Sequence, residues 1–252
     1  ESLRRAGAEP VLTPAEAAAG ARALIVCVVD ARQCEDVLFG PDGAAAALAP
    51  ATPVLLCPTI APQDAESLSA RLVAAGAAPI HAPMSGGPAR ARDGSMSLMV
   101  ACADPAFAAA SGLLSALSSK LFRVGTRPGD GARTKLVNNL LAGINLVGAA
   151  EALALAQRLG LDLSRTLEVI EQSSGQSWIG SDRMRRAIAG DYEPRAHVTL
   201  LRKDTALAME AAKLAGFEGP LGAAARDAFE EAACAGLADL DDAALFRWIS
   251  RS

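Results

Sequence analysis

The periodicity of the sequence changes near residue 129, and this change limits the folds that the chain can adopt. Before it, short apolar runs alternate with helical patterns, beginning with Leu24–Val29 (LIVCVV). A continuous apolar run of this length predicts a strand that is buried on both faces of a sheet. Further strands are predicted at 54–57, 79–82, 98–102 and 121–124, and helices at 14–19, 33–38, 63–75 and 105–117. This alternation is typical of βαβ units and a largely parallel sheet.

After residue 129 the pattern is helical almost throughout. Helices are predicted at 131–159, 162–172, 182–189, 201–214, 221–235 and 241–249, with Ser164, Asp182 and Asp241 as N-caps. We therefore predict an α/β sheet domain at residues 1–128 and an all-helical domain at residues 129–252. The opening ESLRRAGAEP resembles the end of a helix that stops at Gly7, so we expect the first domain to be N-terminally truncated.

The composition argues against several classes of protein. With 51% hydrophobic residues the chain is too apolar to be disordered. Its 24 basic and 28 acidic residues give a net charge of −4, whereas binding to nucleic acids or anionic membranes needs clustered positive charge. No unbroken apolar run reaches the roughly 18 residues that span a bilayer. We expect a cytoplasmic protein whose five scattered cysteines are reduced core thiols, not disulfides or zinc ligands: Cys27, Cys34, Cys57, Cys102 and Cys234.

The strongest candidate for chemistry is the segment GDGARTKLVNN at 129–139. Two glycines open the predicted helix, Lys135 follows about one turn in, and Asn139 lies four residues further on the same face. The positive end of the helix dipole and burial in a cleft would both lower the pKa of the Lys135 amine. Such a lysine can act as a general acid or base, and Asn139 can both donate and accept hydrogen bonds. Taken alone, the segment is better explained as an ordinary surface helix, and it is the three segments described next that favour the chemical interpretation.

A glycine pair follows the predicted strand at 79–82. In APMSGG at 82–87, the backbone N–H groups of Gly86 and Gly87 and the hydroxyl of Ser85 could receive a carboxylate. A simple turn at the end of a strand is the alternative.

Two further segments accompany these. PTIAP at 58–62 places Thr59 beyond the carboxyl end of a predicted strand, where parallel sheets bind ligands, although a helix cap explains Thr59 as well. LLRKD at 200–204 places Lys203 on a helix, where it could point towards a cleft while Asp204 fixes its neighbours. An ordinary helix start with mixed charges is the alternative.

Together with VLFGPDGAAAAL at 37–48, these four segments resemble the β-hydroxyacid dehydrogenase family over essentially the whole chain. The family includes 3-hydroxyisobutyrate dehydrogenase, tartronate semialdehyde reductase and L-threonate dehydrogenase. The resemblance implies a Rossmann-like domain followed by an all-α domain, and oxidation of a small hydroxy acid with NAD, or with NADP. It also implies site residues: Lys135 as the catalytic acid/base; Ser85, Gly86, Gly87 and Asn139 as substrate contacts; Val29, Asp30, Thr59 and Lys203 as cofactor contacts.

Within the family, the chain is most similar to the L-threonate dehydrogenases. The similarity lies in CVVDARQCEDVLFG at 27–40, SSGQSWIGSDR at 173–183 and DYEPRAHVTLLRKD at 191–204. It implies a sugar acid such as L-threonate as substrate, with polar groups near Ser177 and Trp178 to bind the extra hydroxyls. 3-Hydroxyisobutyrate dehydrogenase and tartronate semialdehyde reductase activities are the alternatives. An imine reductase of this architecture would generally lack Lys135.

The chain departs from the family in one respect, because it contains no GxGxxG fingerprint. A truncated or degenerate non-catalytic protein that oligomerises is therefore the alternative from another class. The alanine-rich helical half has apolar residues on several faces, which predicts a homodimer or homotetramer. His81 and His197 are expected not to be catalytic: His81 should be packed on its strand, while His197 should lie in a loop near the helix of Lys203.

Overall fold

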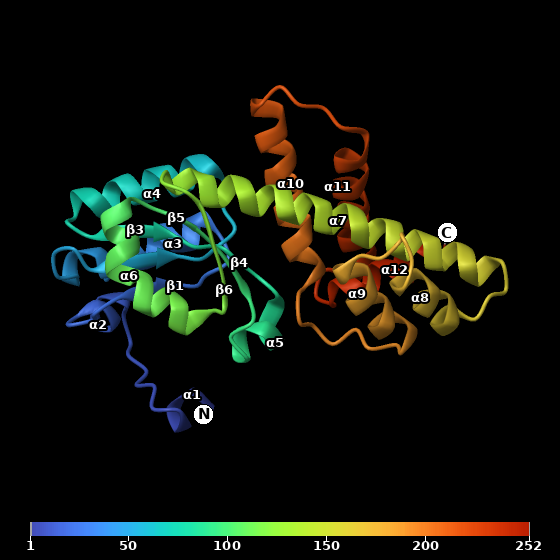
Figure 1. Cartoon of the computed structure of the whole chain (residues 1–252), viewed down its shortest axis with the longest axis horizontal. Coiled ribbons are helices and arrows are strands. Elements are labelled where there is room, and N and C mark those ends of the chain that lie inside the picture. Colours follow the sequence, from blue (N-terminus) through green and yellow to red (C-terminus); the bar gives the residue numbers. More distant parts are fainter. Residues whose placement is uncertain (1, 252) are drawn as a thin grey trace. The chain divides into compact units, whose positions relative to one another are not determined.

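The computed structural model describes residues 2–251, which form two compact units that meet between residues 135 and 136. The boundary lies inside a single long helix, α7 (Pro128–Arg158), so that this helix contributes to both units (Figure 1). Its first turns belong to the first unit, where Ala132 is buried in a core beneath the sheet.

The first unit is built around a six-stranded mixed sheet. Its strands are β1 (Leu24–Val26), β2 (Pro53–Leu56), β3 (Ala78–His81), β4 (Met84–Ser85), β5 (Ser97–Ala101) and β6 (Lys120–Gly125). The strands β1, β2 and β3 are parallel neighbours, as predicted, but β5 runs antiparallel to both β3 and β4. The chain reverses here because β3 is followed by β4 and the short helix α5 (Gly87–Arg92), with no long crossover helix before β5.

The strands β3 and β4 behave as one interrupted strand. His81 pairs with Ala101, Met84 with Leu98 and Ser85 with Ser97, which is a single unbroken antiparallel register. The amide of Met99 donates to the carbonyl of Pro83 at 2.9 Å within the interruption. The residues that lead up to Ser85 are therefore held by the sheet.

Helices cover both faces of this sheet. The helices α3 (Ala31–Phe39) and α4 (Pro62–Ala74) pack on the face that carries Val54 and Leu56. The helix α6 (Asp104–Leu117) packs on the opposite face, against Leu55 and Ile80. This alternation along β2 is what a strand buried on both sides requires. The helices α1 (Ser2–Arg5) and α2 (Pro14–Ala18) and the 3₁₀ turn η1 (Ala44–Ala47) complete the unit.

The second unit is helical. The remainder of α7 is followed by α8 (Leu163–Glu171), α9 (Trp178–Ile188), α10 (Val198–Leu214), α11 (Pro220–Ala232), the π-helical turn η2 (Ala233–Leu237), the 3₁₀ turn η3 (Asp242–Ala244) and α12 (Leu245–Ile249). Their core includes Leu146, Leu153 and Phe229.

The N-caps of this unit were predicted in part. The side chain of Asp241 accepts from the backbone of Ala243, as a cap should. Ser164 and Asp182 are not caps, because α8 and α9 begin earlier. Asp162 and Ser177 cap these two helices by accepting from the amides of Arg165 and Gly180.

The helix α7 is long and apolar enough to cross a membrane by length and composition, and no other helix in residues 2–251 passes that test. Its apolar residues are interrupted by polar ones, so no unbroken apolar run exists. Leu146, Ala150 and Leu153 are buried in the core of the second unit. This packing is consistent with the core helix of a soluble protein.

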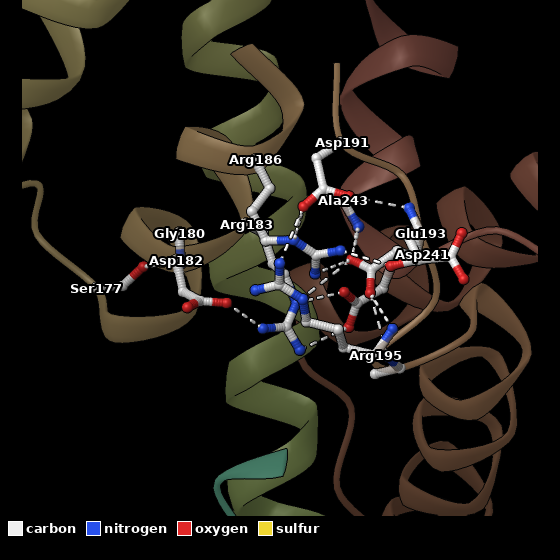
Figure 2. Close-up of polar contacts among 12 residues, drawn as sticks. Ser177, Gly180, Asp182, Arg183, Arg186, Asp191, Glu193, Arg195, Asp241 and Ala243 are labelled. Carbon is white, nitrogen blue, oxygen red and sulfur yellow. Dashed lines mark hydrogen bonds and ion pairs between the residues drawn. The ribbon is translucent and has the colours of Figure 1, made fainter. Parts of the chain in front are cut away.

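A buried ion network fixes the segment between α9 and α10. Figure 2 shows Arg183 and Arg186 converging on Asp241; Arg186 lies 2.8 Å from it, and Arg183 also binds Asp242. A carboxylate oxygen of Asp241 accepts from the amides of Arg195 and Ala196, at 2.8 and 3.2 Å. Burial of Asp241 opposes its ionisation, but these bonds and Arg186 lower the pKa of Asp241 to about 2.

We expect that Arg183→Met will destabilise the second unit by about 1–3 kcal/mol, because Asp241 and Asp242 lose a hydrogen-bonding counter-charge. Burial raises the pKa of Asp242 to about 7 even beside Arg183, so this carboxyl takes up a proton in the variant and the loss is smaller than for a stranded charge. Trp178 and Trp248 are the two tryptophans of the chain and both lie in this unit, so urea unfolding followed by tryptophan fluorescence reports on it.

The matched control is Arg226→Met. Its ion pair with Asp227 is 42% and 55% exposed, so the expected loss is below about 1 kcal/mol. Equal losses in the two variants would contradict the importance of the network.

Candidate active site

Three of the predicted segments lie at one edge of the sheet. Because β1, β2 and β3 are parallel neighbours, their carboxyl ends share this edge. Val29 and Asp30 follow β1, Thr59 follows β2, and Ser85–Gly87 follows β3. Open α/β sheets bind their ligands beyond such carboxyl ends.

The Ser85–Gly87 segment has a backbone that only glycine adopts without strain. Gly86 and Gly87 have φ values of +133° and +69°, and a Cβ at Gly86 would lie 2.7 Å from Cδ of Arg90. Ser85 just before them is paired with Ser97 in the sheet. Consecutive backbone N–H groups beside a fixed hydroxyl are suited to a carboxylate, and this role stays a prediction.

The residues after β1 form a helix cap. Asp30 accepts from the amide of Gln33 at 2.8 Å, and the side chain of Gln33 accepts from the amide of Val29 at 2.9 Å. The side chain of Val29 is 48% exposed beside this cap. A dinucleotide that lies across the strand ends would therefore find an apolar surface at Val29, which fits a ring or ribose of such a group, whereas the chain has no GxGxxG turn for its phosphates.

Thr59 is half-buried between β2 and α4. The N-cap of α4 is Ala61, so the alternative of Thr59 as a helix cap is wrong. Its role as a cofactor contact stays a prediction.

Lys135 is a buried lysine, with 6% of the residue exposed. It lies about two turns into α7, which begins at Pro128, so the expectation of one turn is wrong. Because the dipole effect is concentrated in the first turn, the helix dipole does not support a role for Lys135 as an acid or base. The burial of Lys135 still supports that role.

The start of α7 is attached to the end of β3. Nδ1 of His81 bonds to the carbonyl of Pro128 at 2.8 Å. A Cβ at Gly131 would lie 2.9 Å from this nitrogen and 3.3 Å from Cδ of Pro83. Gly131 and Lys135 are four residues apart and share a helix face. The face of α7 that carries Lys135 is therefore the one that packs on the residues just before Ser85.

Asn139, one turn beyond Lys135, is also buried, with 8% exposed. Its Nδ2 donates to Asp204 at 2.5 Å, and its Oδ1 accepts from Nδ2 of Asn138 at 2.9 Å. Asp204 also pairs with Nζ of Lys203 at 2.8 Å. Asp204 thus fixes its neighbours, as expected from LLRKD, but its bond to Asn139 has no signal in the sequence, because 65 residues separate the two.

Other predicted residues have structural roles. Ser177 caps α9, accepting from Gly180 at 3.1 Å, and Trp178 beside it is 45% exposed. His81 is fully buried, as expected. His197 is exposed and bonds to the carbonyl of Asp239 at 3.1 Å.

The cysteines differ from the prediction in part. All five are free, but Cys27 and Cys234 are exposed and are not core thiols. Burial raises the pKa of Cys57 to about 12, so this thiol is unreactive at neutral pH. Within residues 2–251, no group of three His, Cys, Asp or Glu side chains is placed to hold a metal ion.

His81 makes the first unit sensitive to acid. Burial lowers the pKa of His81 to about 4, against the carbonyls of Pro128 and Pro58, which favour its protonated form. An unfolded histidine titrates near 6.5, so above that pH His81 is neutral in both states and does not reduce the stability. As the pH falls from 6.5 towards 4, the unfolded state takes up the proton first, and the free energy of unfolding decreases by about 3 kcal/mol in total. Hydrogen exchange in β3 and the first turns of α7, corrected for intrinsic rates, should show this loss between pH 7 and pH 4.5.

In His81→Gln this pH dependence should be much weaker, because glutamine does not titrate. The exposed His197→Gln should behave like the unmodified protein. An unchanged dependence in His81→Gln would show that other groups cause it.

Comparison with protein families gives a match for each half of the chain. Residues 1–125 match the family described as the NAD binding domain of 6-phosphogluconate dehydrogenase. Residues 129–249 match the family described as NAD-binding of NADP-dependent 3-hydroxyisobutyrate dehydrogenase.

Curated relatives span nearly the whole chain. L-threonate dehydrogenase of Cupriavidus necator is 38% identical over 96% of this chain and 82% of its own length. L-threonate dehydrogenase of Escherichia coli K12 is 38% identical over 90% and 76%. 3-Hydroxyisobutyrate dehydrogenase of Pseudomonas aeruginosa is 34% identical over 88% and 77%.

Solved structures of dehydrogenases also resemble this chain. A 3-hydroxyisobutyrate dehydrogenase from Salmonella typhimurium has a TM-score of 0.89 at 36% identity, over 94% of this chain and 82% of its own. Psf3 in complex with NADP+ and 2-OPP has a TM-score of 0.90 at 28% identity, over 98% and 87%. An imine reductase from Pseudomonas sp., at 20% identity and a TM-score of 0.63, shares the fold.

The chain has a Rossmann-like domain with a mixed sheet, followed by a helical domain. This fold and these matches define an NAD(P)-dependent dehydrogenase. The chain belongs to the 3-hydroxyisobutyrate dehydrogenase family of hydroxyacid dehydrogenases, whose substrates are small hydroxy acids. The predicted fold class, family and cofactor type are confirmed.

Proposed function

We propose that the protein oxidises a sugar acid, L-threonate, to its oxo acid with NAD, and that Lys135 is the general base. The observation that carries this proposal is the buried Lys135, on the helix face that packs against the residues leading to Ser85. The relatives at 36–38% identity that are named L-threonate dehydrogenase support the choice of substrate.

The residues of the chain divide the work of substrate binding. The hydroxyl of Ser85 and the amides of Gly86 and Gly87 receive the substrate carboxylate. Asn139 and Lys135, one turn apart on α7, hold the hydroxyl that reacts.

The neutral amine of Lys135 takes the proton of that hydroxyl while the C–H bond breaks. NAD or NADP, when bound, accepts the hydride. In the reverse direction, the ammonium of Lys135 returns its proton to the developing alkoxide. This buried, oriented set of groups favours catalysis over a purely structural, oligomerising role.

Four residues are proposed to hold the cofactor. Val29, Asp30 and Thr59 lie at the strand ends where a dinucleotide is expected. Lys203 is assigned on the family resemblance alone, and its pairing with Asp204 balances much of its charge.

Oligomer formation is part of the proposal. The second unit exposes several large apolar side chains: Val137, Leu141, Leu155, Leu159, Val169, Leu214 and Phe217. We propose that a second copy of the chain covers part of this surface in a cytoplasmic homodimer or homotetramer, which light scattering tests directly.

Lys135→Ala should lower kcat by about 10²–10⁴-fold and leave cofactor affinity nearly unchanged, because the change removes proton transfer. Lys135→Arg should be equally impaired, since a guanidinium stays protonated at working pH. The exposed Lys120→Ala is the control and should be unaffected. Near-normal turnover in Lys135→Ala would rule out the assigned role.

Steady-state kinetics on a panel of acids tests the substrate. With L-threonate, erythronate, glycerate, 3-hydroxyisobutyrate and L-serine, and with NAD and NADP, the highest kcat/KM is expected for L-threonate with NAD. A higher value for 3-hydroxyisobutyrate would transfer the assignment to the alternative. Absence of turnover on every acid would overturn the proposed function.

A further inference from the structure

We propose that Asp204 is a positioning residue which holds the side-chain amide of Asn139 in one orientation, with Asn138 as its second hydrogen-bond partner, so that Asn139 offers the substrate hydroxyl a hydrogen-bond donor. This inference rests on the reaction proposed above. It concerns how the hydroxyl is held, and adds two residues to those already assigned.

Asp204 selects the orientation of the Asn139 amide, and Asn138 makes a contact that is compatible with it. An amide side chain can turn over by 180° with little change in shape, exchanging its oxygen and its nitrogen. In the observed orientation, Nδ2 faces the carboxylate of Asp204 and Oδ1 faces Nδ2 of Asn138. The reversed orientation would place oxygen against the carboxylate of Asp204, which only accepts, so that contact would become unfavourable. Asn138 is exposed and can turn its own amide to match, so it adds a contact without selecting an orientation.

The bond to Asp204 is placed to be strong. Asn139 is 8% exposed and Asp204 6% exposed, so water competes little for either group. A hydrogen bond to a carboxylate is stronger than one between neutral groups, more so in a buried setting. The ammonium of Lys203, 2.8 Å from the other oxygen of Asp204, balances its charge.

The backbone brings the two side chains together. One turn beyond Asn139, a Cβ at Gly143 would lie 2.8 Å from Cγ2 of Thr205. The helices α7 and α10 therefore approach closely beside the pair because residue 143 has no side chain. The start of α10 is held in turn by the bond from the amide of Val198 to the carbonyl of Leu240, at 3.0 Å.

The orientation matters for the direction of proton transfer. With one hydrogen of Nδ2 committed to Asp204, the second can point to the oxygen of the substrate hydroxyl. That hydroxyl then accepts from Asn139 and must donate its own hydrogen elsewhere, which is to the amine of Lys135. A reversed amide would accept that hydrogen and compete with Lys135 for it.

Kinetics provide the first test. Asp204→Asn should lower kcat at least tenfold and change KM less, since an uncharged amide no longer selects one orientation of Asn139. In the Asn139→Ala background, Asp204→Asn should cause no further loss of kcat, because its partner is gone. Additive losses in the double variant would overturn the proposal. The exposed Asp227→Asn is the control and should leave kcat unchanged.

Side-chain NMR provides a test that needs no substrate. The chain has three asparagines, Asn138, Asn139 and Asn145, so selective ¹⁵N labelling gives three amide groups. One proton of the Asn139 amide should be shifted downfield and exchange slowly. Asp204→Asn should abolish both properties while the Asn145 signals stay in place. An Asn139 amide that does not change would contradict the proposal.

The design separates the possible failures. If no acid is turned over, the proposed function fails, while the spectrum still decides whether Asp204 orients Asn139. If Asp204→Asn does not fold, as circular dichroism would show, Asp204→Ser replaces it. That variant also removes the acceptor-only carboxylate and should shift the Asn139 amide and lower kcat; no change in either would overturn the proposal.

Discussion

The close packing of the first turn of α7 on the end of β3 places the residues on which the chemistry depends. A Cβ at Gly131 would lie 2.9 Å from His81 and 3.3 Å from Pro83, so α7 approaches the sheet as closely as a helix backbone allows. The carbonyl of Pro128 supplies the partner of the buried imidazole at this contact. Once this contact is made, the rise and twist of the helix determine where Lys135 points. The interrupted strand that contains Pro83 leads directly to Ser85, so the same strand positions both Lys135 and the proposed carboxylate-binding segment.

Much of the fold was predictable from the sequence, because periodicity reports burial on one face or two. The continuous apolar run at Leu24–Val29 indicated a strand, and the long helical pattern after residue 129 indicated α7. The expectation that this strand is buried on both faces was wrong, because β1 ends at Val26, stands at one end of the sheet order and leaves Ile25 43% exposed. The reversal of direction at β5 was not predictable, since the pairing of His81 with Ala101 is a long-range event that leaves no local pattern. The caps of α8 and α9 were placed too late in the sequence, because helix boundaries depend on single hydrogen bonds.

The candidate site was predictable where residue type and spacing carry the chemistry. The spacing predicted that Lys135 and Asn139 share one face of a helix, and α7 carries both. Their chemical roles came from the family resemblance and stay a proposal. The contacts that orient these residues were not visible, because they join positions far apart in the chain. Asp204 reaches Asn139 only after α10 has packed on α7, and α10 begins where it does because Asp241 holds the amides of Arg195 and Ala196. The buried ion network of the second unit therefore helps to position Asp204, and through it Asn139, without contacting either residue.

The spacing of Gly131, Lys135, Asn139 and Gly143 has a consequence for how this family can change over evolutionary time. Each is four residues from the next, so each neighbouring pair shares a helix face, and the two glycines are points of close backbone approach. Many side chains on the outer surface of α7 can be exchanged without altering this arrangement. An insertion or deletion of one residue between the glycines is different, because it turns everything beyond it by about 100° and shifts it by about 1.5 Å. The length of this stretch should therefore be far less variable than its composition.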